Sequence, residues 1–326
     1  MKLSREIVLE YMQEQAEEHP EGVWFTTQEL SGVFGMQRSN LSKLLNELVK
    51  ENRIRKTNGR PVYYFPVKKG EESCFREMVG ASESLKQAIQ LTKAALLYPG
   101  GALPILIKGP DGSGKSMLAS LVYEFAKEQG ILGAGAPFVK INCRYLEEES
   151  GEKRREVFFS ETDGAFHRGR NGVLFIDHIN CLGPGVQDEL LRQVESFQTS
   201  FTDMVLIYSV DDAITSSQLS LYVSKFSIVV DLPALSSRTL LERFELVQQF
   251  FQKEAVRMKR EIKINAELLR ALLLYPCQFN VKQLKKDIRI GCANGYARNF
   301  DRKVEQIEVS MRDFPDYVRR GLLSYR

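Results

Sequence analysis

The chain has 326 residues, of which 43% are hydrophobic and 27% charged, and its formal net charge is +3. These values are typical of a soluble globular protein with room for two or three domains. No apolar run reaches the length of a membrane span, and no apolar segment of a signal peptide follows Met1. The five scattered cysteines form no C-x-x-C pair, so the sequence predicts reduced thiols in a cytoplasmic protein.

Residues 1–66 have the pattern of a small helical module that ends in a hairpin. An amphipathic helix comes first, and Thr26 with Glu29 forms a capping-box pattern at the start of a second, short helix. Gly35 permits a tight turn before a third helix at 38–51. Asn58-Gly59 then separates two strand-like runs, which is a strong hairpin signal. This order predicts a winged helix-turn-helix domain over residues 1–66.

The charge of this first module favours contact with double-stranded DNA. Between Met36 and Lys69 there are nine basic residues and two acidic ones. Such a basic face, on a helix that fits a major groove, is suited to phosphates and base edges. The residues predicted to contact DNA are Arg38, Ser39, Asn40, Ser42, Lys43, Asn46 and Arg60. The alternative interpretation is a protein-contact module whose basic residues are only solvated.

The stretch 105–120 carries the most specific signal in the chain. The apolar run at 105–107 predicts a buried strand, and the residues after Ser116 have helical periodicity. The segment between them fits the G-x-x-x-x-G-K-[ST] pattern of a P-loop, and strand and helix supply the context that this motif requires. It predicts a nucleotide site in which backbone N–H groups and Lys115 bind phosphates. The predicted nucleotide-binding residues are Gly109, Pro110, Asp111, Gly112, Ser113, Gly114, Lys115 and Ser116.

Further strands predict a parallel sheet around this loop, at 138–143, 173–177, 204–208 and 226–231. The apolar run at 173–177 ends in Asp177, which is the Walker B form. Ser116 and Asp177 are expected to hold Mg²⁺, the aspartate through water. The sequence therefore predicts a linker at 67–74, an α/β nucleotide-binding domain at 75–235 and an all-α lid at 236–326.

At this point the chain resembles the sigma-54-dependent activators of the AAA+ class. It is most similar to the levanase-operon-regulator subgroup, in which a winged helix precedes the ATPase. The resemblance rests on Asn142-Cys143, Gly164-Ala165-Phe166, the Walker B run, 187–192, Leu232-Pro233-Ala234-Leu235 with Arg238, 274–276, 280–285 and 313–318. It implies ATP with Mg²⁺, homo-oligomers formed through AAA+ interfaces, and sigma-54 RNA polymerase as a partner.

Several family positions differ in this chain. The sigma-contacting loop, GAFTGA in the family, reads Gly164-Ala165-Phe166-His167-Arg168-Gly169 and is shortened. His178 stands where the family has the Walker B glutamate, so it is the candidate base. The sensor-one position is Asp211, an acid that repels a γ-phosphate unless a metal or lysine intervenes. The arginine-finger position falls on Lys225, a second catalytic candidate, and sensor two falls on Lys282.

These differences separate ATP binding, which the sequence predicts, from ATP hydrolysis, which it leaves open. An arginine finger alone contributes ~10³–10⁵ in rate. The predicted function is a DNA-binding transcription regulator with an ATP-binding AAA+ module. The first alternative is a nucleotide-binding scaffold, or pseudo-ATPase, that does not remodel sigma-54 polymerase. The second alternative is a protein-binding adaptor that never contacts DNA.

Overall fold

The computed structural model describes residues 2–18, 25–50, 53–56, 62–66, 74–199, 204–212, 214–299, 306–320 and 322. These residues belong to two compact units, Met1–Arg76 and Glu77–Arg326. The predicted turn at 57–60, which includes Arg60, and residues 67–73 of the predicted linker lie outside the described residues. The domain boundaries predicted after residues 66, 74 and 235 stay predictions.

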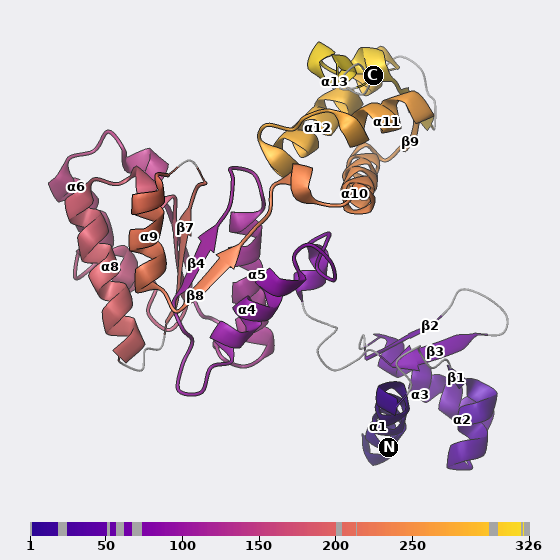
Figure 1. Ribbon diagram of the computed structural model, residues 1–326. Helices are drawn as coiled ribbons and strands as arrows, with labels where there is room; N and C mark the ends of the chain where they lie inside the picture. Colours follow the sequence, from indigo (N-terminus) through magenta and orange to yellow (C-terminus); the bar gives the residue numbers. More distant parts are fainter. Residues whose placement is uncertain are drawn as a thin grey trace. The chain divides into compact units, whose positions relative to one another are not determined.

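The first unit combines helices with a small antiparallel sheet whose strand order is β1-β3-β2 (Figure 1). Its elements are α1 (Lys2–Glu18), β1 (Phe25–Thr26), α2 (Thr27–Phe34), α3 (Arg38–Lys50), β2 (Ile54–Lys56) and β3 (Tyr63–Pro66). The predicted capping box is confirmed: Thr26 Oγ1 accepts from the Glu29 amide at 3.2 Å, and Gly35 ends α2 in the left-handed region. The winged-helix assignment stays a prediction.

The second unit is built on a five-stranded parallel sheet with the order β5-β6-β7-β4-β8. The predicted parallel α/β fold is therefore confirmed. The helices α8 and α9 lie on one face of the sheet, and α4 and α5 lie on the other (Figure 1). The strands are β4 (Ile105–Lys108), β5 (Phe138–Asn142), β6 (Val173–Asp177), β7 (Val205–Val210) and β8 (Ile228–Asp231). The helices are α4 (Lys86–Leu96), α5 (Lys115–Glu128), α6 (Gly151–Phe159), α7 (Ala165–Arg168), α8 (Pro184–Thr199) and α9 (Ser216–Lys225).

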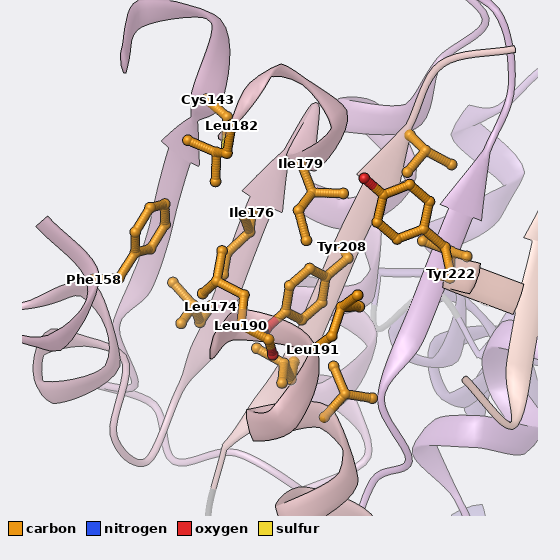
Figure 2. Packing of buried hydrophobic residues seen from close by; sticks show 14 of the residues in the cluster. Cys143, Phe158, Leu174, Ile176, Ile179, Leu182, Leu190, Leu191, Tyr208 and Tyr222 are labelled. Carbon is orange, nitrogen blue, oxygen red and sulfur yellow. Dashed lines mark hydrogen bonds between the residues drawn. The ribbon is translucent and has the colours of Figure 1, made fainter. Parts of the chain in front are cut away.

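The core of this sheet is apolar on both faces, as a parallel sheet requires. Every residue of β6 and β7 is buried. Leucines of α8 and Tyr222 of α9 pack against one face, where Tyr208 donates a hydrogen bond to the Leu190 carbonyl at 3.1 Å (Figure 2). This packing fixes the carboxyl ends of β4, β6 and β7 at one edge of the sheet.

The C-terminal part of the second unit is mainly helical, with α10 (Leu240–Met258), α11 (Ala266–Leu274), α12 (Asn280–Arg298) and α13 (Asp316–Arg320). The prediction of an all-α lid was wrong, because β9 (Glu261–Ile264) pairs in parallel with β10 (Gln306–Val309). Side chains alternate between exposed and buried along β10, and Ile307 and Val309 join the core of the lid. Each strand has four residues and the pairing is distant in sequence, so the local pattern carried little signal.

Side chains of the lid donate hydrogen bonds to backbone carbonyls of the P-loop. Arg238 Nη2 donates to the Ser113 carbonyl at 2.8 Å, and Asn280 Nδ2 donates to the Asp111 carbonyl at 2.8 Å. A Cβ on Gly112 would lie 2.1 Å from the Phe279 carbonyl oxygen. The start of α12 therefore closes directly over the loop that precedes α5.

Candidate functional site

The P-loop connects β4 to α5 through left-handed backbone. Gly112 has φ 76° and Gly114 has φ 116°, conformations that favour glycine. Gly109, at φ 158°, has no room for a side chain because a Cβ would lie 2.6 Å from the Leu232 carbonyl oxygen. The loop therefore delivers the N-terminus of α5, whose first amide groups lack helical partners and attract anions.

Lys115 at this N-terminus is buried, and its ammonium bonds within the protein. Nζ donates to the Gly109 carbonyl at 2.6 Å and to the Pro110 carbonyl at 3.2 Å. It also lies 2.7 Å from Asp211 Oδ1. These three contacts match the three hydrogens of an ammonium group. A phosphate that binds Lys115 must therefore displace one of them.

Asp211 follows β7 and contacts two further side chains besides Lys115. Its Oδ2 lies 2.8 Å from His178 Nδ1 and 2.9 Å from Arg144 Nη2. Burial raises the pKa of the Asp211 carboxyl, but hydrogen bonds from His178 and Lys115 outweigh burial and hold that pKa well below its usual range. Asp211 is therefore an ionised carboxylate at the centre of a cationic cluster.

Asp177 ends β6 beside the P-loop. Its Oδ2 lies 3.1 Å from Ser116 Oγ, and its Oδ1 accepts a 2.5 Å hydrogen bond from Ser209 Oγ. Lys140 Nζ lies 2.8 Å from Ser116 Oγ and 3.3 Å from Asp177 Oδ2. The P-loop serine and the Walker B aspartate thus meet as predicted, with a lysine between them.

His178 is held in the left-handed region, at φ 60°, which is uncommon for a residue other than glycine. Its backbone N–H donates to Ser209 Oγ at 3.0 Å. Because Asp211 is ionised, the short contact to Nδ1 requires a proton on that nitrogen. The second ring nitrogen, Nε2, lies 3.7 Å from Asp177 Oδ1. The ring is thus oriented by carboxylates on both sides.

These groups border a cavity of about 500 Å³ above the P-loop. Basic side chains dominate its described lining, which includes Lys115, Lys140, Arg144, Arg238, Lys253, Lys282 and Lys285, against the acids Glu77, Asp111 and Asp177. Two buried polar atoms of this lining, Ser113 Oγ and Arg238 Nε, have no hydrogen-bond partner among the described residues. The cavity is therefore suited to a polyanion that brings acceptor oxygens.

Comparison with known proteins identifies the type of domain. Residues 78–201 match the sigma-54 interaction domain. This match assigns that part of the second unit to the sigma-54 interaction domain family. The chain is 30% identical to the transcriptional regulatory protein LevR of Bacillus subtilis, over 92% of this chain and 37% of LevR. It is 27% identical to the transcriptional regulatory protein DagR of Salmonella typhimurium, over 88% of this chain and 36% of DagR. The chain thus spans little more than a third of these relatives.

The fold is shared with NtrX from Brucella abortus, solved in complex with ADP. The TM-score is 0.58 at 17% identity, and the match covers 96% of this chain and 71% of NtrX. This likeness confirms the AAA+ fold. Among the described residues, no helix is long and apolar enough to cross a membrane.

Most of the residues predicted for the nucleotide site lie close together in the structure. P-loop residues 111–116 line the cavity together with Asp177, His178 and Lys282. Gly109 and Pro110 are not in the described lining, and Asp211 reaches Lys115. Lys282 Nζ lies 3.6 Å from Asp111 Oδ2. Lys225 lies at the end of α9, where it pairs with Glu195 of α8, and it is not part of the described lining. Its role as a finger toward another subunit stays a prediction.

The segment that corresponds to the family's sigma-contacting loop is folded onto the core. Residues Ala165–Arg168 form the single turn α7. The Phe166 ring stacks on Phe159, with ring centroids 5.4 Å apart and planes at 9°, and it also contacts Phe197. His167 and Arg168 are exposed. The aromatic residue of this segment is thus a packing residue.

Sequence reasoning assigned no role to Lys140, Arg144 or Ser209. Lys140 and Arg144 flank the Asn142-Cys143 pair that carries part of the family resemblance. Two basic residues next to that pair could have indicated a contribution to the anion-binding site. Ser209 lies in the buried strand β7, two residues before Asp211. Its sequence context gave no signal that it belongs to the site.

The predicted DNA-contacting residues of the first unit lie on α3, except Arg60, which is outside the described residues. Arg38, Ser39, Asn40 and Lys43 are exposed, while Ser42 and Asn46 are half-buried. Asn46 is partly engaged, since Nδ2 donates to the Ser42 carbonyl and Oδ1 accepts from Lys56. A continuous exposed face therefore remains at the start of α3.

We predict different effects for substitutions of two adjacent acids. Asp211→Asn removes a carboxylate that is stabilised in the folded state, so at pH 7 it should lower the free energy of unfolding by about 1–3 kcal/mol. Because the folded-state pKa is depressed, this loss should be full above about pH 5 and shrink as the pH falls below about 4. Urea unfolding across this pH range measures it.

The matched control is Asp212→Asn. Burial is the largest influence on the Asp212 carboxyl and raises its pKa, so neutralising this residue should leave stability unchanged or slightly increased at pH 7. Equal destabilisation by both substitutions would contradict the assignment of Asp211 as the paired carboxylate.

Proposed function

We propose that this chain is a nucleotide-binding transcription regulator that places a sigma-54-type AAA+ module on double-stranded DNA in the cytoplasm. The observation that carries the proposal is the P-loop cavity, in which the N-terminus of α5, Lys115 and the Ser116–Asp177 pair face one cationic space. That arrangement fits the phosphate chain of ATP.

The unpartnered atoms of the cavity support a phosphate ligand. Arg238 is 8% exposed and bonds the P-loop through Nη2, while its Nε lacks a partner among the described residues. A buried donor without an acceptor is costly, and a phosphate oxygen would satisfy it. The lid residues that touch the loop would then respond to whether the nucleotide is present.

Recognition of DNA is proposed for α3 of the first unit. Its exposed face offers Arg38 and Lys43 for phosphates, and Ser39 and Asn40 for base edges. The names of LevR and DagR describe transcriptional regulators, which agrees with such a role. Sigma-54 RNA polymerase, and further copies of this chain bound through AAA+ interfaces, are the proposed partners.

A second candidate function is a scaffold that binds ATP without turning it over. It is favoured by the contacts of Lys115, whose ammonium is neutralised by Asp211 in place of a γ-phosphate. The packing of Phe166 against Phe159, which holds this segment on the core, also agrees with a scaffold that does not remodel sigma-54 polymerase. Phosphate release from ATP that disappears in Lys115→Met would favour the first candidate, and an absence of release at any protein concentration would favour the scaffold.

We predict that Lys115→Met weakens binding of a fluorescent adenine nucleotide by about 10- to 100-fold, because a charge-assisted contact to phosphate is lost. Fluorescence anisotropy of the full chain measures it. Lys108→Met is the control, since Lys108 precedes the loop and pairs with Asp231 at 2.9 Å outside the cavity. Undiminished binding by Lys115→Met would refute the proposed nucleotide site.

We predict that Arg38→Gln and Lys43→Gln each weaken duplex binding and reduce the slope of log K against log salt by about 1. A gel-shift titration over salt concentration measures both. Lys153→Gln makes the same charge change on α6 of the second unit, where Lys153 pairs with Glu149, and should leave the slope unchanged. If all three variants kept the slope of the unmodified chain, α3 would not contact the duplex.

A further inference from the structure

The two oxygens expected to hold a divalent cation already have a cation beside them. Ser116 Oγ and Asp177 Oδ2 lie 3.1 Å apart. Lys140 Nζ lies 2.8 Å from the first and 3.3 Å from the second. The three atoms thus form a closed triangle. The donor set would suit Mg²⁺, whose bonds to oxygen measure about 2.0–2.1 Å, but the ammonium fills the space between the donors and repels a doubly charged ion.

The sheet fixes this position for Lys140. In the parallel pair of β5 and β6, Asn142 lies opposite Asp177 and Lys140 lies opposite Phe175. Residues two apart on a strand share a face, so the Lys140 side chain runs along β6 toward Asp177. Its ammonium lies 5.2 Å from the centroid of the Phe175 ring, a favourable cation–π distance. The register of β5 on β6 and the contact with the Phe175 ring therefore both place the Lys140 ammonium beside Asp177.

Asp177 also needs the charge that Lys140 supplies. The carboxylate is 2% exposed, and a buried carboxylate requires a nearby positive charge or several hydrogen bonds. Ser209 Oγ donates to Oδ1, and Ser116 and Lys140 contact Oδ2. His178 Nε2 lies 3.7 Å from Oδ1. A bound divalent ion would have to displace Lys140 from an arrangement that already satisfies Asp177.

We propose that Lys140 takes the place of the divalent cation, so that a nucleotide's phosphate chain binds in this cavity without a bound metal ion. The inference rests on the nucleotide binding proposed above. An ammonium group has three hydrogens. Ser116 Oγ accepts one of them, and Asp177 Oδ2 lies 3.3 Å from the nitrogen as its ion-pair partner. A further hydrogen is available to a phosphate oxygen at the start of α5.

The experiment uses the full chain and fluorescent ADP, which removes hydrolysis from the measurement. Dissociation constants are compared in excess EDTA and in saturating Mg²⁺. The unmodified chain should bind with constants that differ by less than about threefold between the two conditions. Lys140→Met should bind about tenfold or more weakly in EDTA, the equivalent of about 1.4 kcal/mol, and should recover when Mg²⁺ is added. Lys108→Met, a lysine substitution outside the cavity, should match the unmodified chain in both conditions.

The outcomes separate the inference from the function on which it rests. A loss of affinity of tenfold or more when EDTA is added to the unmodified chain, with recovery in Mg²⁺, would overturn the inference and leave nucleotide binding intact. Binding of Lys140→Met that equals the unmodified chain in EDTA would also overturn it. Failure of the unmodified chain to bind ADP in either condition would overturn the proposed function. Because the unmodified chain is tested by itself, the result does not depend on the variant folding.

Discussion

The candidate site depends on one buried ion pair, between Lys115 at the start of α5 and Asp211 after β7. The carboxyl ends of parallel strands meet at one edge of a sheet, and here β4 lies directly beside β7. That adjacency brings the P-loop lysine to within 2.7 Å of an ionised carboxylate. His178 and Arg144 bind the other oxygen of the same carboxylate, so three cationic or polar groups from three segments share one anion.

A consistent chemical pattern follows from this arrangement. The site supplies an internal anion next to the P-loop lysine and an internal cation next to the Walker B aspartate. In P-loop proteins generally, a phosphate and a metal ion fill these roles. Asp211 and Lys140 are thus protein charges that compensate Lys115 and Asp177, respectively. The lid contacts the same loop through hydrogen bonds from Arg238 and Asn280. A ligand that changed the contacts of Lys115 or Asp177 would therefore also change the environment of the start of α12.

The sequence predicted those parts of the molecule that are set by local pattern. The P-loop, the buried strand that ends in Asp177 and the capping box of α2 were all recognisable from a few consecutive residues. Sequence reasoning also identified Asp211 as an acid that would require a lysine or a metal, and Lys115 is that lysine. The parts it missed depend on distant pairing. The strands β9 and β10 pair although α11 and α12 separate them in sequence, and the position of Lys140 beside Asp177 depends on the register of β5 on β6.

The central claim is that Lys115 and Asp211 are energetically coupled, and a double-mutant cycle tests it most directly. Urea unfolding at pH 7 is measured for the unmodified chain, Lys115→Met, Asp211→Asn and the double variant. A buried pair at 2.7 Å should give a favourable coupling energy of about 1–3 kcal/mol. A coupling energy below about 0.5 kcal/mol, the usual error of additivity for independent sites, would contradict the account.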